Sequence, residues 1–148
     1  MDTKKISDGT CPVGRGLARV GDAWSMLILR DASLGLTRFD EFQRSLGIAP
    51  NILTRRLAAL VGDGLLERRR YSAHPPRDDY VLTACGRDYL PILSALGAWG
   101  ARHFGEGGVT RLVEAGSGRT IDPVVVDRAT GRPLDEIDLR TVLPTGTV

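Results

Sequence analysis

The chain has 148 residues, of which 42% are hydrophobic and 26% charged, enough for one soluble domain with a substantial core. Its longest apolar runs are far shorter than a membrane span, and its first residues lack the apolar stretch of a secretion signal. Two cysteines, Cys11 and Cys85, do not make a disulfide framework, so we expect a protein of the reducing cytoplasm. The net charge of +2 is by itself weak evidence for a nucleic-acid partner.

The positive charge is concentrated in one part of the chain. Residues 1–104 hold 15 Lys and Arg against 11 Asp and Glu, whereas residues 105–148 hold 5 against 7. Residues 50–77 alone hold six arginines against two acids. Clustering of this kind is typical of protein surfaces that bind phosphate groups. The sequence therefore indicates one basic surface on an otherwise balanced protein.

The first part of the chain is predicted to form three short helices. The first begins after Cys11, where Pro12 suits the first turn. The second, about 22–33, is apolar nearly all round and is predicted to lie in the core. The third, about 39–46, repeats apolar residues at helical spacing and has two acids in its first turn, where they favour the helix dipole.

The fourth predicted helix, about 49–62, has one apolar edge and one polar face. The apolar edge consists of three leucines: Leu53, Leu57 and Leu60. Helical periodicity places Asn51 and Arg55 opposite that edge, with Thr54 at the flank and Arg56 nearer the leucines. Ala49 at the cap position offers no side-chain acceptor, which weakens this end of the helix. A helix of this kind suits the reading of DNA.

Two strands are predicted next, at 65–71 and 79–82, joined by a tip whose two prolines resist regular pairing. Thr83 can cap a fifth helix, about 84–103, in which Pro91 predicts a kink. The apolar residues of the fifth helix cover more than one stripe. We therefore expect it to pack on its own domain and on a second subunit.

Beyond three glycines at 105–108, residues 109–148 are predicted to form an acid-leaning appendage with short strands and no internal repeat. The strands are expected at 110–113, 123–127 and 138–143, with a hairpin turn at 129–131. The sequence of residues 126–134, VDRATGRPL, resembles the knuckle of a zinc ribbon. However, residues 105–148 contain neither Cys nor His, so no metal site is expected.

The predicted fold is α+β and mainly helical: a winged helix-turn-helix with an N-terminal helix, a long C-terminal dimerisation helix and a small β-rich appendage. The predicted domains are residues 11–104, for DNA binding and dimerisation, and 109–148, without metal ligands. Catalytic and nucleotide-binding motifs are missing from the sequence, so neither an enzyme nor a cofactor is expected.

Several segments together resemble the HxlR family of bacterial transcription regulators across roughly residues 11–104. They are Cys11-Pro12, GDAWSMLILRD (21–31), TRFDEF (37–42), NILTRRLAALVGDGLLERRRY (51–71), PPR (75–77), YVLTACGRDYLPIL (80–93) and ALGAWG (95–100). The resemblance implies a homodimeric winged-helix protein that binds a palindromic operator. By position, helix 49–62 is the recognition helix, 71–79 is the wing, and Cys11 stands where several family members sense oxidants or electrophiles.

The candidate DNA-binding residues combine the predicted helix faces with this resemblance. They are Arg38, Asn51, Thr54, Arg55, Arg56, Arg68, Arg70 and Arg77. Asn51 and Arg55 are expected to contact base edges, since Asn suits adenine and Arg suits guanine. Arg38 is expected at a phosphate and Arg77 in a narrow minor groove. Arg68 and Arg70 alternate with Arg69 along a strand, so the three cannot all face the duplex.

The partners expected are double-stranded DNA and a second copy of the chain, joined through the first and fifth helices, with no membrane. Cys11 is a candidate sensor because a helix N-terminus favours a thiolate, although cysteine is also a common packed residue. The alternative is a small apolar effector held near Trp99, between the fifth helices, or in a cleft under the appendage. A winged-helix module that binds proteins rather than DNA is the competing function.

Overall fold

The computed structural model describes residues 6–144, which form two compact units: unit 1 up to Leu90, and unit 2 from Pro91 onwards. No helix within 6–144 is long and apolar enough to cross a membrane. The last residues of the predicted appendage, 145–148, lie outside the described part of the chain.

Between residues 12 and 62, unit 1 has helices whose bounds agree with the prediction to within one or two residues. They are α2 (Pro12–Val20), α3 (Ala23–Ser33), α4 (Phe39–Leu46) and α5 (Pro50–Gly62). Asp22 caps α3, since its carboxylate accepts the N–H of Ser25 at 3.0 Å. Ala49 precedes α5 without a side-chain cap, as the sequence predicts.

The core of unit 1 is built from α3, α4, α5 and the segment after α5. Its buried apolar residues are Val20, Ile28, Leu29, Phe42, Ile48, Leu53, Leu57, Leu60, Leu65 and Leu66. The predicted leucine edge of α5 is therefore confirmed. In α3, by contrast, only Ile28 and Leu29 are buried apolar residues, and Ser25 and Asp31 are buried with them.

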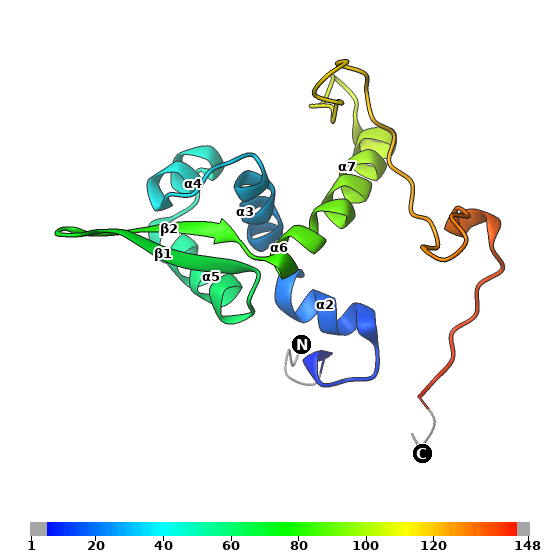
Figure 1. The fold of residues 1–148 in the computed structure, drawn as a ribbon, viewed down its shortest axis with the longest axis horizontal. Coiled ribbons are helices and arrows are strands. Elements are labelled where there is room, and N and C mark those ends of the chain that lie inside the picture. The colour runs from blue at the N-terminus through cyan, green and yellow to red at the C-terminus, as the bar shows by residue number, and fades with distance from the viewer. Residues whose placement is uncertain (1–5, 145–148) are drawn as a thin grey trace. The chain divides into compact units, whose positions relative to one another are not determined.

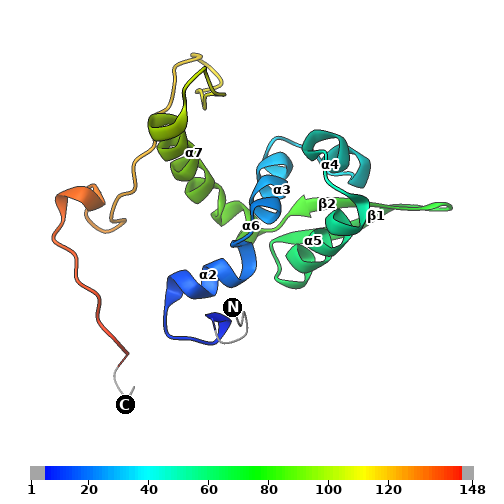
Figure 2. The same ribbon diagram turned by 180° about the vertical axis from the view of Figure 1, so that it is seen from behind.

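An antiparallel hairpin of β1 (Leu66–Ala73) and β2 (Pro76–Leu82) follows, and its far end extends past α4 and α5 (Figures 1 and 2). The prediction that the tip lacks regular strand pairing is wrong, because Ala73 pairs with Pro76. Proline is tolerated at the first residue of a strand, where the lost N–H interrupts no ladder. The strands therefore continue almost to the turn, with a bulge between Arg70 and Ser72.

The predicted fifth helix is divided into α6 (Ala84–Asp88) and α7 (Leu90–Phe104). Thr83 caps α6 by accepting the N–H of Gly86 at 3.0 Å, as predicted. The break falls at Tyr89, just before Pro91, because proline cannot donate to the preceding turn. The predicted kink is thus present as an interruption of the helix.

The predicted β-rich appendage is not formed as strands within residues 105–144. Two isolated bridges, Val113 to Thr120 and Val126 to Pro133, replace the expected strands, and segment 138–143 has no regular structure. A short 3-10 turn, η1 (Leu134–Glu136), follows the second bridge. Strands need a continuous ladder, and Pro133 cannot donate to one.

The two bridges close two copies of one turn, at 113–120 and 126–133, which corrects the expectation of no internal repeat. Each copy contains, in order, a valine, an acidic residue, two variable residues, a serine or threonine, a glycine and an arginine. In each, the acid N–H donates to the arginine carbonyl at 2.9 Å, and the glycine N–H donates to the acid carbonyl at 2.8 Å and 2.7 Å respectively. The hydroxyl of Ser117 or Thr130 donates to the carboxylate of its own copy. The predicted turn at 129–131 is part of the second copy.

Candidate nucleic-acid interface

Helix α5 presents three of the predicted DNA-binding residues to solvent: Asn51, Thr54 and Arg55 are exposed. Their i, i+3, i+4 spacing places them on one face, opposite the buried leucines. The Thr54 hydroxyl donates to the Pro50 carbonyl at 2.9 Å. Thr54 therefore offers its methyl group and its remaining lone pair to a partner, rather than its proton.

Most arginines of the basic cluster at 50–77 are engaged by carboxylates of unit 1. On α5, Arg56 forms an ion pair with Asp22, with Nε 3.2 Å from Oδ1, although the two atoms are not aligned as a hydrogen bond. This contact holds Arg56 against the N-terminus of α3. The location agrees with the predicted position of Arg56 on the side of α5 nearer the leucines.

On the hairpin, Arg68 and Arg70 share Asp78, at 3.9 Å and 3.1 Å. Arg69 lies on the other face, where it forms a two-pronged hydrogen bond with Glu67 and lowers the pKa of that carboxyl. The predicted alternation along the strand is confirmed. Asp78 partly neutralises the two arginines that share its face, so their charge is not simply added to a DNA-binding surface.

Arg55 and Arg77 are the two arginines of 50–77 for which the described residues provide no ion-pair partner. Both side chains belong to exposed residues. Arg55 is on α5, and Arg77 is near the far end of the hairpin, opposite Ser72. A guanidinium without an internal carboxylate partner has its charge available for an external anion.

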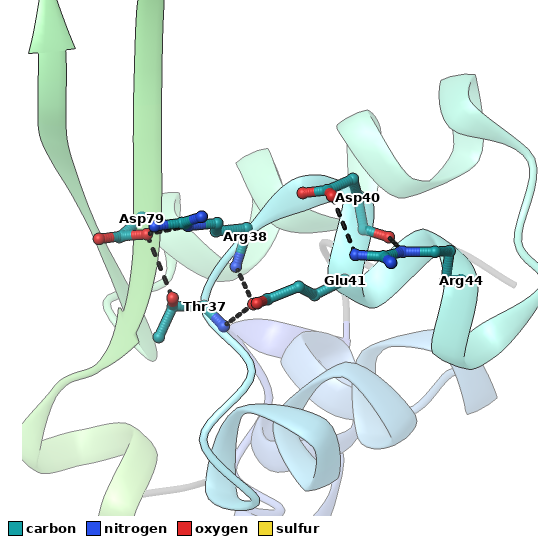
Figure 3. Close-up of polar contacts among 6 residues, drawn as sticks. All are labelled: Thr37, Arg38, Asp40, Glu41, Arg44 and Asp79. Carbon is teal, nitrogen blue, oxygen red and sulfur yellow. Dashed lines mark hydrogen bonds and ion pairs between the residues drawn. The ribbon is translucent and has the colours of Figure 1, made fainter.

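Arg38 precedes α4, and Figure 3 shows how this end of the helix is organised. Glu41 accepts the N–H groups of Thr37 and Arg38, each at 2.9 Å, which lowers the pKa of the Glu41 carboxyl. The Arg38 side chain extends towards Asp79 of β2, with Nε 3.8 Å from Oδ1. The loop before α4 is thus tied both to its own helix and to the hairpin.

The residues that contact these arginines were not identified from the sequence: Asp22, Glu67, Asp78, Asp79 and Tyr71, whose ring centre lies 4.9 Å from the central carbon of the Arg38 guanidinium. For Asp78 the signal was present, because folding the hairpin back places it opposite Arg70. Asp79 lies opposite Arg69 in the register, but its carboxylate contacts Arg38 instead. The role of Tyr71 could not be read in this way, since it lies at the bulge, where the register shifts.

Cys11, the predicted sensor, is the N-cap residue of α2 and is exposed. Its Sγ accepts the N–H of Gly14 at 3.4 Å. Cys85, on α6, is also exposed and unpaired. Within residues 6–144 no group of three or more His, Cys, Asp or Glu side chains is arranged to hold a metal ion.

Comparison with known proteins agrees with this architecture. The HTH-type transcriptional regulator Rv3095 of Mycobacterium tuberculosis is 39% identical over 134 residues, which are 89% of this chain and 83% of the relative. The solved structure of PA1607 matches with a TM-score of 0.81 at 40% identity, covering 92% of this chain and 98% of that protein. That of PA1374 from Pseudomonas aeruginosa matches with a TM-score of 0.66 at 51% identity, covering 93% and 95%.

Shorter structures match as well. The redox regulator HypR in its reduced form has a TM-score of 0.59 and 33% identity, covering 63% of this chain and 95% of its own. The transcriptional regulator YodB of Bacillus subtilis, in its reduced form, has a TM-score of 0.55 and 26% identity, covering 68% and 100%. The model of the HxlR-like helix-turn-helix family matches residues 19–107. The chain therefore belongs to the HxlR family of helix-turn-helix transcriptional regulators, which are not enzymes.

Proposed function

We propose that the chain acts in the cytoplasm as a homodimeric regulator that binds a palindromic operator. In this proposal α5 enters the major groove and the far end of the β1–β2 hairpin contacts the neighbouring backbone or minor groove. The observation that carries the proposal is the pair of arginines without a carboxylate partner among the described residues, Arg55 on α5 and Arg77 on the hairpin, in a cluster whose other arginines are ion-paired.

The chemistry of the exposed α5 face suits base edges. Arg55 can donate two hydrogen bonds to guanine, and Asn51 can pair in the same way with adenine. Thr54, whose proton is held by the Pro50 carbonyl, can contact a thymine methyl or accept from a base amino group. Arg38 and Arg77 supply phosphate or minor-groove contacts, which set affinity more than sequence preference.

The proposal of a homodimer is supported by the apolar side chains that each unit, described by itself, leaves exposed. On α2 they are Val13 and Leu17, and on α7 they are Ile92, Leu96, Trp99 and Phe104. Monomeric proteins seldom leave helices so apolar. A two-fold dimer places its recognition helices about 34–36 Å apart, one turn of DNA, so the operator should be an inverted repeat.

The test is selection of DNA fragments from a random pool by the purified full-length protein, followed by titration of the selected fragment against salt. We expect an inverted repeat with half-sites about one helical turn apart, and an affinity that falls steeply with salt. A protein that enriches no sequence and binds no DNA even at low salt would instead be a winged-helix module for protein partners.

We further propose that Cys11 makes the regulator responsive to oxidants or electrophiles. Its exposed Sγ at the start of α2 supports this, as does the similarity to HypR, whose solved forms are reduced and oxidised. Modification there would change the dimer and hence the spacing of the two α5 helices. Operator binding by parent, Cys11→Ser and Cys85→Ser proteins should be compared with and without oxidant.

The expected result is that only Cys11→Ser loses the response. If Cys11→Ser responds as the parent does, the thiol proposal is wrong. A small apolar effector near Trp99 then becomes the better explanation, and fluorescence of that tryptophan can report its binding.

A further inference from the structure

The loop before α4 is fastened to the hairpin through its backbone. The N–H of Tyr80 donates to the Thr37 carbonyl at 2.7 Å, and Arg38 forms an antiparallel bridge with Asp79. The Thr37 hydroxyl donates to the Asp79 carboxylate at 3.1 Å (Figure 3). This loop therefore pairs with β2 through a single isolated bridge, and it connects the hairpin to the helix that precedes α5.

The Arg38 guanidinium is held on two sides by the same hairpin. Its Nε lies 3.8 Å from Asp79 Oδ1, and its central carbon lies 4.9 Å from the centre of the Tyr71 ring. The Tyr71 ring thus makes a cation–π contact with the face of the Arg38 guanidinium, and the Asp79 carboxylate attracts its Nε edge. We call Thr37, Arg38, Tyr71 and Asp79 the wing clasp.

The wing clasp leaves the outer end of Arg38 available. The ion pair with Asp79 involves Nε, and the terminal nitrogens of Arg38 make no hydrogen bond within residues 6–144. The side chain is 53% exposed. Arginine binds phosphate through paired N–H groups in a planar fork, so a guanidinium fixed in this way presents a ready phosphate-binding edge.

We propose that Tyr71 and Asp79 are positioning residues that hold Arg38 in advance as a phosphate contact, and so couple the hairpin to the recognition helix. This inference rests on the proposed DNA binding. A long arginine side chain loses rotamer freedom when it binds, and contacts that fix it beforehand reduce that loss. The same contacts hold the hairpin and the N-terminus of α4 together as one surface.

Tyr71 offers the cleaner test, because replacing it changes no charge. Tyr71→Leu removes the ring, whereas the matched variant Tyr71→Phe keeps it. We expect Tyr71→Leu to bind both selected and random DNA about two- to fivefold more weakly, in line with an exposed cation–π contact, and Tyr71→Phe to bind like the parent. In an Arg38→Ala background, Tyr71→Leu should cause no further loss.

The salt dependence of binding distinguishes positioning from general damage to the fold. Arg38→Ala should lower the slope of log affinity against log salt by about 1, the value for one lost phosphate contact. If Tyr71→Leu acts through Arg38, its slope should fall between those of the parent and Arg38→Ala. Thermal unfolding of each variant confirms that the compared proteins are folded.

The two neighbouring acids of β2 provide a second, charge-matched comparison. Asp78→Asn and Asp79→Asn remove the same charge, but Asp78 engages Arg68 and Arg70 whereas Asp79 engages Arg38. If only the net charge of the protein mattered, both variants should gain the same DNA affinity. If Asp79 positions Arg38, the Asp79→Asn protein should bind DNA more weakly than the Asp78→Asn protein. This difference should disappear in the Arg38→Ala background.

The outcomes separate the two proposals. A parent protein without salt-dependent DNA binding would refute the proposed function itself. If the parent binds DNA but Tyr71→Leu matches Tyr71→Phe, the wing clasp does not position Arg38. The same conclusion follows if Tyr71→Leu costs as much affinity in the Arg38→Ala background as in the parent.

Discussion

Arg56 of α5 and Asp22, the cap of α3, form an ion pair with Nε 3.2 Å from Oδ1. Asp22 also accepts the N–H of Ser25 at 3.0 Å and its hydroxyl at 2.6 Å. One carboxylate therefore caps a core helix and holds Arg56, which lies near the apolar edge of α5. This contact complements the leucines in fixing the orientation of α5, which has no side-chain cap of its own.

Replacing Asp22 should mainly reduce stability. We expect Asp22→Ala to lower the free energy of unfolding by about 1–2 kcal/mol, because the cap of α3 and the contact to α5 are lost together. Arg56→Ala should cost less than about 1 kcal/mol, since the pair is partly exposed. Denaturant titration gives both values. A fall in the salt slope of DNA binding for Arg56→Ala would instead show that Arg56 contacts phosphate.

Arg55→Ala should relax sequence preference. We expect a loss of about 1–3 kcal/mol on the selected operator and a much smaller loss on random DNA, because a bidentate base contact distinguishes sequences. Arg140→Ala removes the same charge from an exposed site in unit 2 and serves as the control. Equal losses on operator and random DNA for Arg55→Ala would exclude base reading by this residue.

Arg77→Ala should weaken binding to all sequences alike. The residue stands near the far end of the hairpin, so it is expected to act on the backbone or a narrow groove rather than on a base pattern. The slope of log affinity against log salt should fall by about 1. An unchanged slope with an altered operator preference would contradict this role.

The contribution of Glu41 to stability should depend on pH. Two backbone N–H groups, from Thr37 first and then Arg38, lower the pKa of this carboxyl below its usual 4.5. Its stabilising effect is therefore complete above the unfolded pKa and is lost as the pH falls through the lower folded pKa. Unfolding midpoints of parent and Glu41→Gln should differ most near neutral pH and converge in acid. The control Glu106→Gln, whose carboxylate is exposed and accepts no hydrogen bond among the described residues, should show no such convergence.

Gly86→Ala should destabilise unit 1. A methyl group at this position would collide with the Leu65 carbonyl oxygen, which is backbone and cannot move aside easily. We expect a loss of about 1–3 kcal/mol in the free energy of unfolding. Gly62→Ala is the matched control, because open space surrounds that position in α5 and alanine is favoured in a helix by about 0.5–1 kcal/mol. A stable Gly86→Ala protein would show that α6 can shift away from Leu65.

The sequence alone determined the elements of unit 1 and the solvent-facing side of α5. Local rules are sufficient there, since capping residues, apolar spacing and proline positions act over a few residues. The same rules located the break before Pro91. They failed for the hairpin tip and for the tail, where single bridges formed instead of strands.

The tertiary structure decided which arginines keep their charge available. Asp22 and Asp79 lie 34 and 41 residues from their partners Arg56 and Arg38, so no local rule pairs them, whereas the hairpin register alone places Asp78 opposite Arg70. An ion pair depends on distance in space, which only folding sets. Six arginines made residues 50–77 look uniformly basic, and folding left Arg55 and Arg77 without a carboxylate partner among the described residues.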